Sequence, residues 1–242
     1  MKTQLINFIL TYLFIIPSFG QEAQKYFEQI NKIVAGETVS RNLYNKLDSL
    51  QAKKIPSRSG ISKYLDRDLD FGYKHQRINI QINFENFRVD LLTSSDSVLL
   101  SVISHNDYKK LQATYYTEAP VLKYLTLRNN FYGSNKKIKD LEEEISSNIT
   151  YAFYCGDGLP KTDEGKQIER LVNTRSINKL NEMLNSINIE TQTYGVAGFK
   201  MLSKKAVIIA KEQEKIIKYI KKRNSEVVTC SGCLTGLVEK IY

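Results

Sequence analysis

The sequence contains no tryptophan and only two histidines, His75 and His105. So few histidines leave little room for a hydrolase, because histidine is the commonest general acid or base in such enzymes. The P-loop, the dinucleotide-binding GxGxxG motif, the zinc-binding HExxH motif and the EF-hand loop are also missing. We therefore expect no cofactor and no catalytic activity.

Long apolar runs are absent beyond the first residues of the chain. Lys2 precedes the run Leu5–Ile16, and the small residues Ser18 and Gly20 follow it. This pattern predicts a signal peptide over residues 1–20, cleaved near Gly20-Gln21, and thus a periplasmic or secreted protein without an integral membrane segment. An uncleaved N-terminal anchor is the alternative, although the run is short for a membrane span.

The chain is basic, with a formal net charge of +9. A basic exported protein can bind a protein partner or an acidic surface such as anionic lipid. The helix expected over Ala206–Arg223 has an isoleucine stripe and an opposite lysine side, so it could lie on such a membrane. We favour a surface helix packed on its own core, because its apolar side lacks Phe and Leu.

The periodicity of apolar residues predicts an α+β fold that is mainly α-helical. Helical stripes over residues 21–54 predict N-terminal helices, and residues 53–60 read as a linker because of their Pro, Ser and Gly. Between residues 76 and 104, apolar and polar side chains alternate as in half-buried strands. We expect a small antiparallel sheet there, within a region of residues 61–118 that also supplies flanking helices.

A change of phase divides the predicted strands. Ile78 to Phe84 alternate in one phase, whereas Phe87, Val89 and Leu91 follow in the other. A shift by one residue would turn every side chain to the opposite face of the sheet. The sequence therefore predicts a tight turn or a bulge between the two runs.

The remaining residues, 119–242, predict a helical region that ends in a cysteine-tied tail. Thr162 is expected to cap a helix, and helical stripes continue to Leu202. This rhythm resembles a HEAT-type helical hairpin over residues 162–202, which implies a helical-repeat-like C-terminal half. Without a second copy, one hairpin in an irregular helical domain is the alternative. The sequence leaves open whether these regions pack as one domain or two.

Two glycines share one of these predicted helices. In a helix interior, Gly195 and Gly198 each cost roughly 1 kcal/mol relative to alanine. The close approach of another backbone would explain both, and so would a bend or a short unwound turn.

Three cysteines, Cys155, Cys230 and Cys233, are the candidate disulfide residues. A disulfide is the default in an exported protein, and an odd number leaves one thiol over. All three pairings stay open. A bond from Cys155 to the tail would close a long loop and stabilise the fold by about 4 kcal/mol in the chain-entropy model.

The CSGC spacing of Cys230 and Cys233 also fits a redox pair or part of a metal site. A thiol–disulfide oxidoreductase would use Cys230 to attack and Cys233 to resolve, with a helix over Leu234–Ile241 after the pair. The tryptophan and proline typical of the thioredoxin motif are missing. A zinc site would need all three thiolates and His75 or His105, and nothing in the spacing asks for it.

Other polar residues have simpler explanations than catalysis. Ser104, His105 and Asp107 are triad residue types, but neighbours in sequence cannot adopt triad geometry. We expect His105 to end a strand, Asp107 to cap a helix and His75 to lie exposed at the start of a strand. The acidic run over residues 142–144 predicts a solvated helix face.

Aromatic and basic residues alternate in only a few places, so the pattern typical of a nucleic-acid-binding surface is weak. The nearest approach to a nucleic-acid surface is Tyr115-Tyr116, and Tyr124 with Arg128 and Tyr132. Core packing explains these tyrosines as well, and export argues against nucleic acid as a partner. Asn148-Ile149-Thr150 matches the N-glycosylation pattern, which has meaning only in a eukaryotic secretory pathway.

The sequence thus predicts an exported, non-catalytic binding or interaction module. Its motivating features are the signal peptide, the helical hairpin rhythm and the lack of a catalytic constellation. The alternative function is an exported thiol–disulfide oxidoreductase that uses the CSGC pair.

Overall fold

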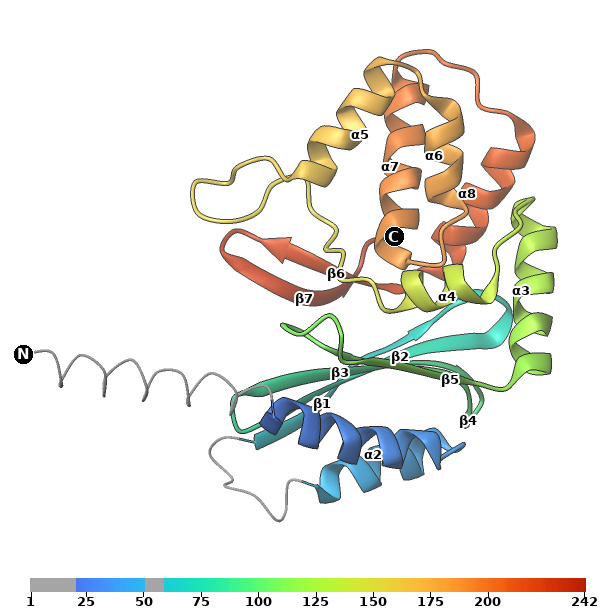
Figure 1. Ribbon diagram of the computed structural model, residues 1–242. Coiled ribbons are helices and arrows are strands. Elements are labelled where there is room, and N and C mark those ends of the chain that lie inside the picture. The colour runs from blue at the N-terminus through green and yellow to red at the C-terminus, as the bar shows by residue number, and fades with distance from the viewer. Residues whose placement is uncertain (1–20, 51–58) are drawn as a thin grey trace, which may run out of the picture.

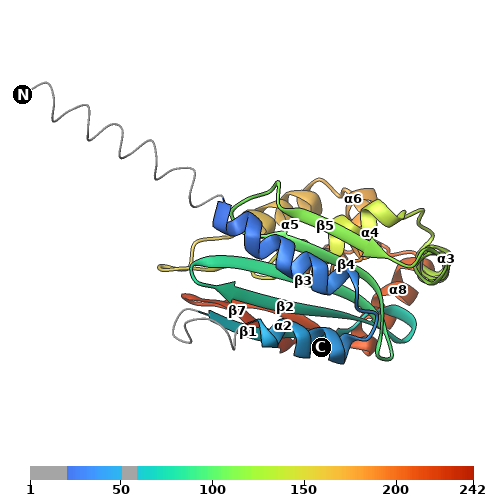
Figure 2. The same ribbon diagram turned by 60° about the horizontal axis from the view of Figure 1, so that its bottom comes forward.

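The computed structural model describes residues 21–50 and 59–242, and Figure 1 shows them in three layers. A five-stranded sheet forms the middle layer. Two N-terminal helices cover one face, and Figure 2 shows them in front of the sheet, running roughly along the strands. The helical C-terminal half lies on the other side. The predicted signal peptide and most of the predicted linker fall outside the described residues.

The sheet is antiparallel throughout, and each strand pairs with the next along the chain in the order β1-β2-β3-β4-β5. Its strands are β1 Ser59–Asp68, β2 Tyr73–Ile82, β3 Glu85–Ser94, β4 Ser97–His105 and β5 Gln112–Tyr116. A separate hairpin near the C-terminus consists of β6 Glu226–Ser231 and β7 Leu234–Lys240.

Helices precede the sheet and follow it. A helix over residues 21–35 comes before α2 Ser40–Ser49, and a single 3₁₀ turn, η2 Asp70–Gly72, joins β1 to β2. The later helices are α3 Glu118–Tyr132, α4 Ile138–Ile145, α5 Asp163–Asn173, α6 Ile177–Leu184, α7 Ile189–Lys204 and α8 Lys211–Arg223. None of the helices in the described residues is long and apolar enough to span a bilayer.

The first core layer lies between the N-terminal helices and the sheet. Ile30 of the first helix and Leu43 and Leu47 of α2 are fully buried there. They pack with three isoleucines of β2 and three apolar residues of β3, namely Ile78, Ile80, Ile82, Phe87, Val89 and Leu91. The helical stripes predicted for residues 21–50 are therefore confirmed, because each helix buries one apolar side against the sheet.

The predicted change of phase is also confirmed as a tight turn. Ile82 pairs with Glu85, so only Asn83 and Phe84 connect β2 to β3. Asn83 adopts a φ of +58°, which suits a two-residue hairpin turn. Phe84 therefore leaves the strand and is exposed, while Phe87 pairs with Ile80 on the buried face.

The prediction of a mainly α-helical fold with a helical-repeat-like C-terminal half is wrong. The fold is a mixed α+β fold, because the sheet has five strands and the C-terminal half contains the β6–β7 hairpin. The strand β1 was not predicted because a bulge between Lys63 and Leu65 interrupts its alternation of apolar and polar residues. β5 lies where a helix capped by Asp107 was expected, and its residues are only partly buried.

Helices α5, α6 and α7 occupy the segment of the predicted helical hairpin. Thr162 caps α5, since its hydroxyl accepts a hydrogen bond from the backbone N–H of Gly165 over 3.0 Å. The glycines of α7 mark a close approach to α6. A Cβ atom at Gly195 would lie 2.8 Å from the backbone nitrogen of Leu184, and one at Gly198 would lie 2.5 Å from the side chain of Leu180.

Candidate functional site

The second face of the sheet has an apolar part and a polar part. Side chains alternate along a strand, so the odd-numbered residues of β2 all point to this face. At one end of the strands, Tyr73 and Leu92 are buried in a core that includes residues of α3 and α4. Toward the other end of β2, Asn79 is only partly buried and Gln81 is exposed. The polar part is therefore open to a ligand.

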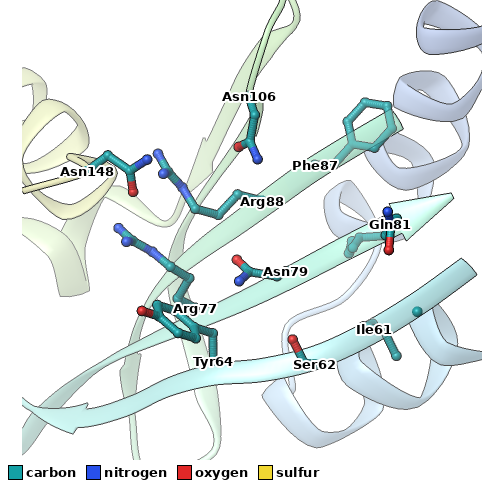
Figure 3. A pocket seen from close by; sticks show the side chains of 12 residues that line it. Ile61, Ser62, Tyr64, Arg77, Asn79, Gln81, Phe87, Arg88, Asn106 and Asn148 are labelled. Carbon is teal, nitrogen blue, oxygen red and sulfur yellow. The ribbon is translucent and has the colours of Figure 1, made fainter. Parts of the chain in front are cut away.

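A hollow of about 450 Å³ lies over the polar part of the sheet. Figure 3 shows four carboxamide side chains around it, those of Asn79, Gln81, Asn106 and Asn148. Within the described residues, none of these side chains forms a hydrogen bond to another protein group. Each carboxamide offers both donors and an acceptor, so the hollow presents hydrogen-bonding capacity that the described part of the chain does not use.

Two arginines, Arg77 and Arg88, form the charged wall of the hollow and extend toward Asn148 in Figure 3. The carboxylate of Asp90 lies between them. It accepts a hydrogen bond from Arg77 Nε over 2.6 Å and one from Arg88 Nε over 2.8 Å. Asp90 is completely buried, so it holds both guanidinium groups in place from below.

The same arginines also bind the end of α4. Arg77 Nη2 donates to the carbonyl oxygen of Ser147 over 2.9 Å, and Arg88 Nη2 donates to that of Ser146. The last carbonyl groups of a helix lack partners within the helix, and they carry the negative end of its dipole. The arginines therefore position the segment that carries Asn148 at the rim of the hollow.

His75 lies behind this wall and is buried. Its Nε2 atom is 2.8 Å from Asp90 Oδ1, and Arg67 Nε donates to its Nδ1 atom over 3.2 Å. Burial lowers the pKa of His75 to about 4, although the hydrogen bond to Asp90 acts in the opposite direction. Because Nδ1 accepts a hydrogen bond, the neutral ring carries its proton on Nε2 and donates it to Asp90.

The charge under the hollow follows from these pKa values. Burial alone would raise the pKa of Asp90, but Arg77 above all, with His75 and Arg88, outweighs it and lowers that pKa to about 2. At neutral pH, Asp90 is thus ionised and His75 is neutral. Two guanidinium charges face one carboxylate charge, which leaves a net positive charge beside the hollow.

Arg67 extends the buried network to the helical half. Its Nη1 atom donates to Glu190 Oε1 over 2.5 Å, and its Nη2 atom donates to Glu190 Oε2 over 3.2 Å. Glu190 also accepts from the backbone N–H of Val228 over 2.9 Å. Burial would raise the pKa of Glu190, but Arg67 outweighs burial and lowers it. This pair ties β1 to α7 and to the C-terminal hairpin.

Tyr64 forms another side of the hollow because of the bulge in β1. The bulge leaves Tyr64 without a partner on β2 and lets its hydroxyl donate to the carbonyl oxygen of Gly236 over 2.7 Å. Gly236 adopts a φ of +78°, and a Cβ atom there would lie 3.0 Å from the hydroxyl. A residue with a side chain at this position would therefore disturb the contact between β7 and β1.

Two of the three cysteines form a disulfide, and the third is a free thiol. Cys155 and Cys230 are bonded, with a sequence separation of 75, and Cys233 is a free, exposed thiol. Cys233 lies in the turn between β6 and β7. The helix expected over Leu234–Ile241 is wrong, because Leu234 begins a strand that pairs with β6.

The structure contradicts the predicted exposure of His75. It confirms that His105 ends a strand but contradicts the helix cap predicted for Asp107. His75 is 1% exposed, so its expected position at the protein surface is wrong. His105 ends β4 as predicted and lies 2.8 Å from Glu85. The backbone N–H of Asp107 donates to the His105 ring over 3.0 Å, in a turn where a capped helix was expected.

The other candidate residues are dispersed or have structural partners. Glu144, from the predicted acidic helix face, accepts hydrogen bonds from the hydroxyl of Ser186 and the backbone N–H of Ile187. Across residues 21–50 and 59–242, no three His, Cys, Asp or Glu side chains are grouped so that they could hold a metal ion.

Among the residues nearest to a nucleic-acid pattern, Tyr115 and Tyr116 lie on β5, where Tyr116 is exposed, whereas the other three belong to a buried cluster around Asp70. Tyr124, Arg128 and Tyr132 are almost completely buried. Asp70 accepts a hydrogen bond from Tyr132 over 2.9 Å and contacts Arg223. Arg128 Nε lies 3.1 Å from Asp70 but is not aligned for a hydrogen bond. These aromatic and basic side chains therefore hold the helices together, and they do not face a partner.

The residues that form the hollow were not identified from the sequence. Arg77, Arg88 and Asp90 occupy the polar positions of the alternating strands, where a half-buried strand turns charged side chains to solvent, so this pattern does not indicate a site. Asn106 and Asn148 lie far from them in the chain and carry no signal of their own.

Comparison of this chain with protein-family models, with curated proteins and with solved structures finds no match.

Proposed function

We propose that this protein is an exported, non-catalytic binding module whose polar hollow holds a small hydroxyl-rich ligand with one negative charge. The observation that carries the proposal is a set of four carboxamides around one hollow that form no side-chain hydrogen bonds to any of residues 21–50 and 59–242. Carboxamides can both donate to and accept from hydroxyl groups, as an acidic sugar would require.

The charge and shape of the hollow support this ligand class. Arg77 and Arg88 outnumber Asp90 by one charge, so a single carboxylate or phosphodiester group would neutralise the wall. The ring of Tyr64 offers a flat apolar surface next to Arg77. A volume of about 450 Å³ lies within the ordinary range for small-molecule sites.

Thermal unfolding with and without added sugars tests the proposal. We expect glucuronate or galacturonate to raise the Tm and neutral glucose to raise it less, because ligands that bind only the native state stabilise it. The double variant Asn79→Ala/Gln81→Ala should lose the shift. The matched control is Asn178→Ala, an exposed position on α6. Equal shifts in both variants, or no shift with any acid, would contradict the proposal.

Export is part of the same proposal and rests on the sequence of residues 1–20. Intact mass of the protein recovered outside the cytoplasm should correspond to a chain that begins at Gln21. A chain that retains Met1 and sediments with membranes would indicate the uncleaved anchor.

Thiol–disulfide exchange is the second candidate, because Cys233 is an exposed thiol on the same hairpin as the bonded Cys230. Cys230 could attack a substrate only after its bond to Cys155 opens. Incubation with a mixture of reduced and oxidised glutathione followed by mass analysis tests this function, because the reduced form can open the disulfide and the oxidised form can modify the free thiol. Readily reversible opening of the Cys155–Cys230 bond would favour it, and glutathione bound only at Cys233 would argue against it.

A further inference from the structure

Exposed lysines gather on the end of α7, the following connection and α8. Residues 200–222 contain eight lysines and two glutamates, a net charge of +6 compared with +9 for the whole chain. All eight lysines are exposed: Lys200, Lys204, Lys205, Lys211, Lys215, Lys218, Lys221 and Lys222. We call these residues the lysine patch.

The lysines of this patch lack acidic partners. Elsewhere in the described chain, eight lysines form salt bridges with Asp or Glu side chains. Within the described residues, no lysine of the patch does so, although Glu212 and Glu214 lie on the same helix. Uncompensated like charges on one surface repel each other, and they attract an anionic partner.

An exposed isoleucine, Ile208, lies on the connection between α7 and α8, within the sequence segment that carries the lysine patch. Ile208 is 92% exposed, whereas its neighbours Val207 and Ile209 pack partly against the core of α5–α8. Figure 1 shows the connection between α7 and α8 at the end of the molecule remote from the N-terminal helices. Ile208 can therefore meet a flat surface without obstruction from the rest of the fold.

A shallow hollow that Ile209, the next residue in the chain, helps to line also combines apolar side chains with lysines. It has a volume of about 390 Å³ and lies between α7 and α8. Val196, Ile209 and Ile217 supply apolar lining. Its polar lining consists of Ser203, Glu214 and the four lysines Lys200, Lys204, Lys218 and Lys221.

We infer that the lysine patch docks on a lipid bilayer with anionic headgroups, with Ile208 inserted among the lipids. Basic residues next to a membrane surface attract anionic lipids, and an apolar side chain adds affinity when it enters the interface. A soluble polyanion would be attracted by the lysines but would gain nothing from an exposed isoleucine. The apolar projection therefore favours a membrane over a glycan or nucleic acid.

The absence of tryptophan from the chain makes a direct test possible. The Ile208→Trp variant carries a single tryptophan, whose fluorescence should shift to shorter wavelength with vesicles of phosphatidylcholine and phosphatidylserine. Vesicles of phosphatidylcholine alone should leave it unchanged. The control variant Leu234→Trp, at an exposed position on β7, should show no shift with either vesicle. A shift of equal size in both variants would overturn the inference.

Sedimentation with the same vesicles tests the contribution of charge. The Lys215, Lys218, Lys221 and Lys222→Gln variant should bind anionic vesicles at least about tenfold more weakly, and added salt should weaken binding by the wild type. Changing Lys109, Lys110, Lys123 and Lys240 to Gln removes the same charge elsewhere and should have little effect.

Heparin distinguishes a membrane from a soluble polyanion. We expect the Ile208→Ser variant to retain wild-type heparin binding and to lose vesicle binding. If Ile208→Ser leaves vesicle binding unchanged, a polyanion surface replaces the membrane proposal. Equal pelleting of the wild type with neutral and anionic vesicles would also overturn it.

Discussion

Buried carboxylates in this protein each bind several donors. Asp90 accepts from His75, Arg77 and Arg88, and Glu190 accepts from Arg67 and a backbone N–H group. A buried ion is tolerated only when its lone pairs are satisfied, because leaving water costs it several kcal/mol. The removal of one partner is therefore more harmful than the removal of the whole pair.

The Arg67–Glu190 pair allows this difference to be measured. We expect Glu190→Ala to lower the free energy of unfolding by about 3–5 kcal/mol, because Arg67 would remain buried without its carboxylate. The double variant Arg67→Met/Glu190→Leu should recover much of that loss. Urea denaturation measures both. If the double variant is as unstable as the sum of its single variants, the interpretation is wrong.

The lowered pKa of His75 should make the free energy of unfolding decrease in acid. Its pKa falls from the unfolded value of about 6.5 to about 4 in the fold, so only the unfolded chain takes up the proton between these values. The resulting stability is fully present above the unfolded pKa and is lost as the pH falls toward the folded pKa. Between about pH 7 and about pH 4.5 the loss should be on the order of 2 kcal/mol.

Urea unfolding of the His75→Gln variant at the same two pH values provides the check. Glutamine can still donate a hydrogen bond to Asp90 but does not titrate, so this variant should lose less stability in acid than the wild type does. An unchanged loss would show that other groups cause it. Asp90, with its pKa lowered to about 2, contributes a further loss only at lower pH.

At the scale of elements, the contact between α6 and α7 depends on two glycines. Alanine would favour the helix by about 1 kcal/mol at either position, but its methyl group would overlap atoms of α6. At Gly195 the overlap involves the backbone of Leu184, whereas at Gly198 it involves the flexible end of Leu180. Backbone cannot move without displacing the helix.

We therefore expect Gly195→Ala to destabilise the protein more than Gly198→Ala, by about 1–3 kcal/mol for the former. Combining Gly198→Ala with Leu180→Ala should remove the overlap. Gly36→Ala, where the nearest atom is at 3.5 Å, serves as the control and should change little. Thermal unfolding of the variants ranks their destabilisation. A larger effect of Gly198→Ala than of Gly195→Ala would contradict the prediction.

At the scale of the whole molecule, the Cys155–Cys230 bond joins the loop before α5 to the C-terminal hairpin. It closes a loop with a sequence separation of 75 residues, so its removal should cost about 4 kcal/mol in the chain-entropy model. We expect Cys155→Ser/Cys230→Ser to lower the Tm markedly. Cys233→Ser is the matched control and should leave the Tm unchanged. A similar decrease in both would mean that the bond contributes little.

Local patterns in the sequence predicted many elements correctly. Alternation identified β2, β3 and β4, and helical stripes identified the N-terminal helices and α5 to α8, although α8 begins at Lys211 and not at Ala206, because these signals depend only on neighbouring residues. β1 and β5 were missed, since a bulge disrupts the first and partial burial weakens the pattern of the second. β7 was mistaken for a helix because a short segment fits either period.

The site depends on contacts between distant parts of the chain. The sequence alone supplied the four carboxamides, the arginines and the three cysteines. Only the tertiary structure brought Asn79 and Asn148 to one hollow, buried His75, and joined Cys155 to Cys230 instead of Cys233. The physical reason is that periodicity reports which side of an element is apolar, whereas pairing, burial and pKa depend on which elements meet in space.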